Sequence, residues 1–297
     1  MNLSTLHDLP TSRPAREYPG AVHCPLQYPG IRPTYSYFYV DGRVLPIRTS
    51  SSGSIQMGAG FGSRSLKQIL KQLHAPPADQ RYAVLAVGSN ACPGRLEEKF
   101  PEGGPDSAMP VLLGTIRDVD TLYLNWLADY GALPATCALS EGNELTIWLN
   151  LFSEHQLEVV NRSETMGEGY KLVRLPQPFR WEEWEIGPVY AYHSSSILEI
   201  DSTPVRLDCF PATSTLPAMN QSEILTLALN AVRFKPRANI EERHAALVAR
   251  SSTRDRVSTQ IQSQLHRDGS ALTPGEVVEP EQMELATWRP SIQRGKS

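Results

Sequence analysis

The chain has 297 residues, of which 40% are hydrophobic and 20% are charged, so it is able to bury a substantial core. Its net charge is −4 without a run of Lys or Arg, and no apolar stretch is long enough for a bilayer span. The first 20 residues lack the basic-then-apolar pattern of a secretory signal. The four cysteines are scattered and form no CxxC pair. We therefore expect a cytoplasmic globular protein that binds neither nucleic acid nor a membrane.

Residues 1–75 are predicted to form an N-terminal arm, a hairpin and a linker. About the first 30 residues are rich in proline and polar side chains, which indicates an extended arm. An Asp-Gly pair at positions 41–42 lies between two β-prone runs and predicts a hairpin. The Ser/Gly-rich residues 49–65 predict a linker, with a mobile lid over a site as the alternative. An amphipathic helix is expected over residues 65–74.

Residues 76–212 are predicted to form the core domain, in which β-prone segments outnumber helices. Helices are expected over 91–100 and 153–164, the second with Ser153 as its N-cap. Because few helices separate the strands, repeated βαβ winding does not fit. We predict an α+β fold with a mixed, curled or barrel-like sheet and helices packed around it. The expected strands are 81–88, 109–119, 121–128, 133–139, 144–152, 169–175, 187–194 and 203–210.

Residues 213–297 are predicted to form a helical extension and a tail. Apolar residues recur at helical spacing over 219–234 and 238–266. Such a helix packs either on its own domain or on a second subunit, so a homodimer is one of the expected states. The tail after residue 267 has no clear pattern and is expected to be partly extended.

The motifs of common enzyme classes are missing from the sequence. It contains no GxSxG, HExxH or GxxxxGK[ST] motif, and no GxGxxG after a strand. The seven histidines are far apart, and the cysteines lie in contexts typical of buried, inert thiols. An enzyme with this sequence is therefore expected to work without a metal, a cofactor, a nucleophilic serine or a thiolate.

Two segments are candidates for chemistry. The strand over 81–88 ends in Gly88-Ser89-Asn90 directly before an expected helix. Unpaired amides at a helix N-terminus attract anions, and Gly88 lets a ligand approach the backbone. The second segment places Glu164 at the end of a helix, where a carboxylate is unfavourable to the helix dipole. Taken singly, each segment also has a purely structural interpretation. The first can be a capped turn, and the second can be an ordinary solvated glutamate.

Taken in order, the two segments resemble the γ-glutamylcyclotransferase family. In that family a strand ends in Tyr-Gly-Ser-Asn, and a later segment reads roughly Leu-Asp-x-x-Glu-Gly before Tyr-x-x-x-x-Val. Residues 87–90, Val-Gly-Ser-Asn, correspond to the first motif in this sequence. Residues 160–164, Val-Asn-Arg-Ser-Glu, correspond to the second, with Tyr170 beyond them.

The resemblance covers about residues 81–210 and includes three departures from the family pattern. Val87 replaces the family's tyrosine, which removes a hydroxyl group from the loop. Asn161 stands where an aspartate is usual, and Thr165 where a glycine is usual. The glutamate of the motif is retained as Glu164.

The resemblance implies an enzyme in which the α-amine of a γ-glutamyl amide attacks its own γ-carbonyl. The products are 5-oxoproline and a free amine, and no protein nucleophile, metal or cofactor is needed. Glu164 would be the general acid/base. The implied substrate-binding residues are Val87, Gly88, Ser89, Asn90 and Tyr170. The alternatives are an enzyme of the same fold that acts on a different amide, and a non-catalytic small-molecule-binding or scaffold protein.

Overall fold

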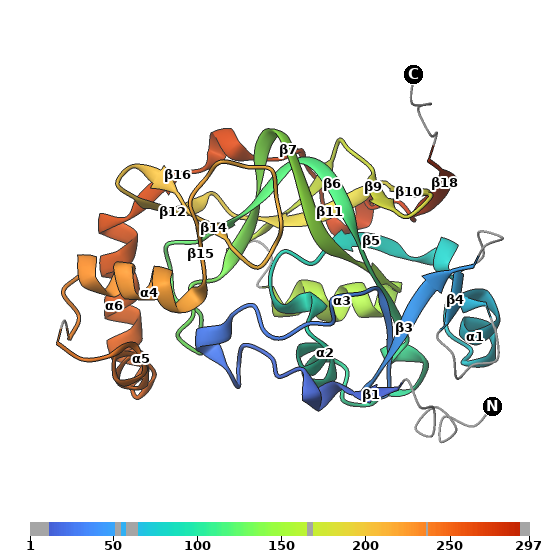
Figure 1. The fold of residues 1–297 in the computed structure, drawn as a ribbon, viewed down its shortest axis with the longest axis horizontal. Coiled ribbons are helices and arrows are strands. Elements are labelled where there is room, and N and C mark those ends of the chain that lie inside the picture. The colour runs from blue at the N-terminus through green and yellow to red at the C-terminus, as the bar shows by residue number, and fades with distance from the viewer. Residues whose placement is uncertain (1–11, 51–54, 58–64, 165–168, 236, 292–297) are drawn as a thin grey trace.

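Two long antiparallel strands, β6 (Met109–Tyr123) and β7 (Ala135–Phe152), run through the centre of the protein (Figure 1). They belong to a computed structural model that describes residues 12–50, 55–57, 65–164, 169–235 and 237–291. Within these ranges the fold is a large mixed sheet with six α-helices packed around it. The predicted α+β fold with a mixed sheet is therefore confirmed.

Each central strand was expected as two shorter ones, and that expectation is wrong. Val119 pairs with Leu139 and Arg117 with Glu144, so residues 140–143 bulge opposite the single residue Asp118. The Asp118 side chain accepts a hydrogen bond from Gly142 N at 2.9 Å. A bulge leaves extra residues unpaired and bends the strand without ending it. The polar residues between the expected strands 133–139 and 144–152 therefore form a bulge within one strand.

The remaining strands extend the sheet on both sides of the central pair. The main hydrogen-bonded order is β1-β3-β2-β6-β7-β5-β11-β8-β17, and β11 and β5 form a parallel pair within it. A smaller sheet has the order β13-β12-β16. The strand bounds are β1 (Arg13–Pro14), β2 (Tyr37–Val40), β3 (Arg43–Thr49), β4 (Ile55–Met57), β5 (Tyr82–Leu85), β8 (Lys171–Leu175), β9 (Phe179–Trp181), β10 (Trp184–Gly187), β11 (Val189–His193), β12 (Ser196–Ile200), β13 (Thr203–Pro204), β14 (Arg206–Leu207), β15 (Ala218–Met219), β16 (His266–Asp268), β17 (Glu276–Val277) and β18 (Thr287–Pro290).

Local sequence signals explain where several elements begin. Asp41 and Gly42 have φ values of 46° and 64° between β2 and β3, as a tight hairpin turn requires. Ser153 caps the third helix in a reciprocal capping box with Gln156, which confirms the predicted N-cap. The helix bounds are α1 (Leu66–Gln72), α2 (Pro93–Lys99), α3 (Glu154–Ser163), α4 (Gln221–Ala231), α5 (Ile240–Val248) and α6 (Ser251–Gln264).

The helix expected over 238–266 is two helices, α5 and α6, so the prediction of one continuous helix is wrong. Arg250 is extended, with φ −147° and ψ 126°, and the chain turns there. The turn allows Leu247 of α5 and Val257 and Ile261 of α6 to be fully buried. A straight helix would point part of this apolar surface toward water, whereas the turn buries both segments.

Both ends of the chain contribute strands to the central sheet. From the N-terminal segment, β2 pairs with β6, while from the C-terminal segment β17 pairs with β8 and β18 with β10. The tail after residue 267 is thus partly extended, as expected, and its strands are paired. The divisions after residues 75 and 212 stay predictions. Of the predicted linker, residues 51–54 and 58–64 lie outside the described residues. In the described part of the chain, no helix is long and apolar enough to cross a membrane.

Candidate functional site

The end of β5 and the end of α3 meet at a cavity of about 680 Å³. The segments come together because β5 pairs with β7, which leads directly into α3. The cavity wall contains every residue that the sequence assigned to a site: Val87, Gly88, Ser89, Asn90, Glu164 and Tyr170. Their spatial proximity is a finding of the structure, while their chemical roles stay predictions.

The loop after β5 differs from the predicted strand-to-helix turn. A single 3₁₀ turn over Ser89–Ala91 follows Gly88, and α2 begins only at Pro93, so the helix expected from residue 91 starts two residues later. Proline is favoured at the first position of a helix because its missing N–H has no helical acceptor there. Among the described residues, the backbone amides of Gly88, Ser89 and Asn90 have no hydrogen-bond acceptor. These amides, rather than the amides at the start of α2, are therefore the unpaired backbone donors of this loop.

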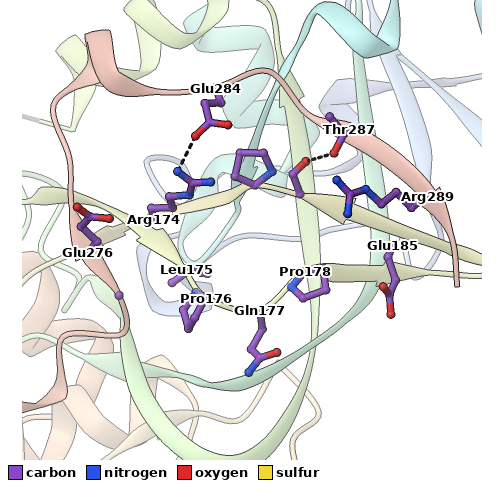
Figure 2. Close-up of a pocket in the computed structure, with 13 residues that line it drawn as sticks. Arg174, Leu175, Pro176, Gln177, Pro178, Glu185, Glu276, Glu284, Thr287 and Arg289 are labelled. Atoms are coloured by element: carbon purple, nitrogen blue, oxygen red, sulfur yellow. Dashed lines mark hydrogen bonds and ion pairs between the residues drawn. The ribbon is translucent and has the colours of Figure 1, made fainter. Parts of the chain in front are cut away.

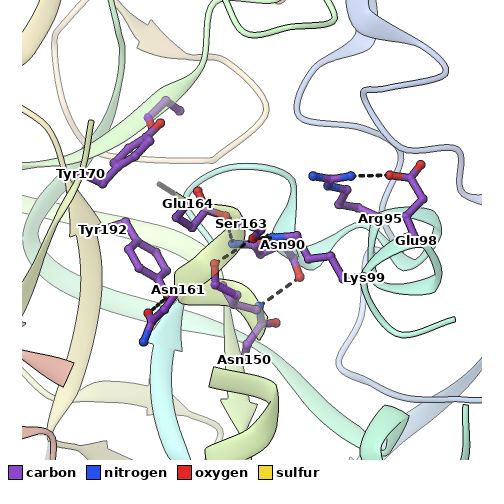
Figure 3. A network of polar contacts seen from close by, with 12 residues as sticks. Asn90, Arg95, Glu98, Lys99, Asn150, Asn161, Ser163, Glu164, Tyr170 and Tyr192 are labelled. Atoms are coloured by element: carbon purple, nitrogen blue, oxygen red, sulfur yellow. Dashed lines mark hydrogen bonds and ion pairs between the residues drawn. The ribbon is translucent and has the colours of Figure 1, made fainter. Parts of the chain in front are cut away.

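Glu164 is held by one of its two carboxylate oxygens (Figure 3). Oε1 accepts hydrogen bonds from Asn90 Nδ2 at 3.0 Å and from Lys99 Nζ at 3.1 Å. Oε2 makes no hydrogen bond to any described residue. It is also not one of the fully buried side-chain atoms without a hydrogen-bond partner, so it is accessible. The carboxylate is thus fixed on one side and open on the other, with 21% of the side chain exposed.

Asn90 positions the acid with its side chain. Its Nδ2 donates to Glu164, its Oδ1 accepts from Lys99 Nζ at 2.7 Å, and its backbone carbonyl accepts from Asn150 Nδ2 at 3.0 Å. The side-chain amide thus uses one of its two N–H donors and one of the two lone pairs of its oxygen. The sequence predicted that Asn90 binds substrate, and this role stays a prediction beside its observed contact with the acid.

Lys99 is a member of the site that sequence reasoning missed. Its ammonium donates to Asn90, Glu164 and Ser163 Oγ, the last at 2.7 Å, and only 5% of the side chain is exposed. Burial lowers the pKa of Lys99, and the charge of Glu164 acts in the opposite direction. In the sequence Lys99 resembles an ordinary lysine in the last turn of a helix, where a cation suits the helix dipole. No local signal indicated its contact with a residue 65 positions away.

Aromatic side chains form another part of the cavity wall. Trp126 packs edge-on against Tyr170 at 6.1 Å between ring centroids, and Tyr170 packs against Tyr192 at 6.5 Å. Tyr28 and Tyr130 also line the cavity. Burial raises the pKa of each of these four tyrosines, so their hydroxyl groups stay protonated at ordinary pH. Tyr28 comes from the N-terminal arm, which was not expected to reach the site.

A second cavity, of about 580 Å³, lies between β8, β10 and the C-terminal strands (Figure 2). Its charged rim includes the ion pair of Arg174 with Glu284, at 2.5 Å, in which both side chains are largely exposed. Exposed pairs of this kind contribute little to stability. None of the residues predicted for a site lines this cavity. Across the residues described, no group of three or more His, Cys, Asp or Glu side chains is arranged to hold a metal ion.

Comparison with known proteins finds a distant structural similarity and no match in sequence. No protein-family model matches the chain, and no curated protein matches it in sequence. A solved structure described as a gamma-glutamyl cyclotransferase aligns with 67% of this chain and 94% of its own, at 13% sequence identity and a TM-score of 0.34. At this level the likeness is too distant to assign a function, which has to be inferred from the residues of the site.

Proposed function

We propose that the protein is an enzyme that cyclises a γ-glutamyl amide to 5-oxoproline and releases an amine. The observation that carries the proposal is the state of Glu164 (Figure 3). One carboxylate oxygen is fixed by Asn90 and Lys99, and the other is open beside a loop whose backbone amides are unpaired among the described residues. A fixed base next to hydrogen-bond donors suits acyl transfer, in which a proton moves and negative charge develops on an oxygen atom.

In the proposed reaction the α-nitrogen of the substrate forms a bond to the carbon of its own γ-carbonyl group. Glu164 accepts a proton from this nitrogen through Oε2, and the γ-carbonyl oxygen becomes negatively charged. The amides of Gly88 and Ser89 donate hydrogen bonds to that oxygen. When the bond between the γ-carbonyl carbon and the leaving nitrogen breaks, Glu164 returns the proton to the departing amine. The nucleophile belongs to the substrate, so the reaction is intramolecular, and the protein has to hold the substrate with its α-nitrogen close to the γ-carbonyl carbon.

The size of the cavity supports a substrate larger than glutamate. A volume of about 680 Å³ falls in the range of small-molecule sites, and its aromatic wall offers an apolar surface to the leaving amine. The alternatives that the sequence left open are a different amide substrate and binding without catalysis.

The test is release of 5-oxoproline from a panel of γ-glutamyl amino acids, peptides and amines. We expect release by the wild type and a loss of about 10²–10⁴-fold in kcat/KM for Glu164→Gln. The matched control is Glu158→Gln, because Glu158 is an exposed residue on the same helix. Thermal melts of both variants establish that they are folded.

The outcomes separate the alternatives. Activity that survives in Glu164→Gln would remove this residue from proton transfer while leaving the reaction in place. If folded wild type releases no 5-oxoproline from any substrate, the cyclase proposal is wrong. Calorimetric titration with 5-oxoproline would then show whether the cavity binds the compound without turnover.

A further inference from the structure

Two tyrosines of the cavity bind the backbone of the same residue, Ala135, in opposite directions. Tyr170 Oη donates its proton to the Ala135 carbonyl at 3.0 Å. Tyr28 Oη instead accepts a hydrogen bond from Ala135 N, also at 3.0 Å. The hydroxyl proton of Tyr170 is therefore already engaged in a hydrogen bond. The proton of Tyr28 has no acceptor among the described residues.

The Tyr28 hydroxyl lies directly against Gly88. A β-carbon built on Gly88 would be 2.7 Å from Tyr28 Oη, closer than such atoms approach each other in proteins. A side chain at position 88 would therefore collide with the tyrosine hydroxyl, so glycine provides the space that this contact needs. The hydroxyl and the unpaired amides of the loop are thus neighbours on the same cavity wall.

The segment that carries Tyr28 is fixed on the rest of the fold. A 3₁₀ turn over Pro25–Gln27 precedes Tyr28, and Gly30 N donates to Gln27 O at 2.8 Å. Ser222 Oγ of α4 donates to Leu26 O at 3.2 Å, which ties the turn to a helix almost two hundred residues later. The Tyr28 side chain is 7% exposed. A donor held in this way needs little rearrangement when charge develops on a substrate.

We infer that Tyr28 is a catalytic residue, which donates its hydroxyl proton in a hydrogen bond to the γ-carbonyl oxygen held by the Gly88 and Ser89 amides. The inference rests on the proposed function. Ala135 N orients the hydroxyl oxygen, and the remaining proton is available to the substrate. Tyr28 would act on the developing negative charge, so it lowers the barrier more than it improves binding of the uncharged carbonyl.

The test compares Tyr28→Phe with Tyr190→Phe in the release of 5-oxoproline. Tyr190 is the matched control because its Oη also accepts a backbone hydrogen bond, from Glu284 N at 2.8 Å, and it does not line the cavity. We expect Tyr28→Phe to lower kcat by about 10²–10³-fold with a smaller change in KM. Tyr190→Phe should keep the wild-type kcat, while both variants lose a similar amount of thermal stability.

Replacement of Tyr28 by 3-fluorotyrosine keeps its size and strengthens its hydroxyl as a donor. If Tyr28→Phe does not fold, this replacement still tests the inference, because a change in kcat at position 28 and none at position 190 supports it. An active wild type together with a Tyr28→Phe or fluorotyrosine variant of unchanged kcat would overturn the inference alone. An inactive wild type would overturn the proposed function and this inference with it.

Discussion

Replacement of Lys99 by methionine removes the ammonium that holds Glu164 and keeps a flexible side chain of comparable length. The Nζ–Oε1 distance is 3.1 Å. At an effective dielectric constant of about 20, this corresponds to roughly 5 kcal/mol of attraction. Burial of the ammonium costs several kcal/mol in lost hydration, which offsets most of this gain. We therefore expect Lys99→Met to lower the free energy of unfolding by about 1–2 kcal/mol, less than in a fully buried pair, because 21% of the Glu164 side chain is exposed.

The effect on activity should be larger than the effect on stability. Without Lys99, Glu164 keeps one of the two hydrogen bonds that fix Oε1, so its open oxygen is less well positioned. A small misplacement of a reacting group costs up to about 10²-fold in rate. We expect kcat/KM for 5-oxoproline release to fall about 10–100-fold in Lys99→Met, with less loss in Lys99→Arg.

The pH dependence gives a sharper test of the same interaction. Burial lowers the pKa of Lys99 from its ordinary value of 10.5, so the folded protein loses this proton before the unfolded chain does. Activity should fall as pH rises through the lowered pKa. The unfolded state binds the proton more tightly, so the contribution of Lys99 to stability rises over the same interval.

Kinetic profiles and thermal melts measured from neutral pH to pH 10.5 would check both signs. In Lys99→Arg the alkaline loss of activity should move to higher pH, because arginine stays charged. The reasoning is refuted if Lys99→Met keeps the wild-type kcat/KM, or if the alkaline limb is the same in all three proteins.

Two further predictions concern the cavity wall and the core. Trp126→Ala should lower kcat/KM by about 10-fold or more for γ-glutamyl amides of aromatic amines, and less for γ-glutamylglycine, because the ring offers an apolar contact; equal losses would contradict this. His193 is buried, its Nδ1 lies 2.7 Å from Cys137 O, and burial lowers its pKa from 6.5. The unfolded chain thus takes up the proton first, and stability is lost as pH falls below 6.5. Melts of His193→Asn, which keeps a donor but cannot titrate, should decline less toward acid pH than those of the wild type.

The sequence predicted the parts of the protein that local chemistry determines. The cap at Ser153 and the turn at residues 41–42 depend on neighbouring residues, and both are observed. The bulge opposite Asp118 was predicted as a break between two strands, because bulges and turns use the same small and polar residues. The strands of the C-terminal tail are two to four residues long and carry no periodic pattern, so only their pairing reveals them.

The residues of the candidate site were likewise predicted only in part. The motif resemblance indicated the loop and the acid, and the structure places them at one cavity. Lys99 and Tyr28 were missed because each reaches the site through contacts with distant segments. Neither belongs to a motif, and a lysine near a helix end or a tyrosine in a proline-rich arm has many ordinary uses. Their roles depend on the tertiary fold rather than on local sequence.

Each member of the Asn90–Lys99–Glu164 network is unfavourable for stability when taken alone. Glu164 carries a negative charge at the C-terminus of α3, Lys99 buries an ammonium, and Asn90 buries an amide. Their mutual hydrogen bonds help to offset these costs, so the single variants Lys99→Met and Glu164→Gln each leave a partner incompletely satisfied. The double variant removes both charges, and we expect it to be more stable than the sum of the two single changes indicates, by about 1–3 kcal/mol. Strict additivity would mean that the pair has no coupling. A double variant that is stable and inactive would indicate that the cluster is retained for its chemistry.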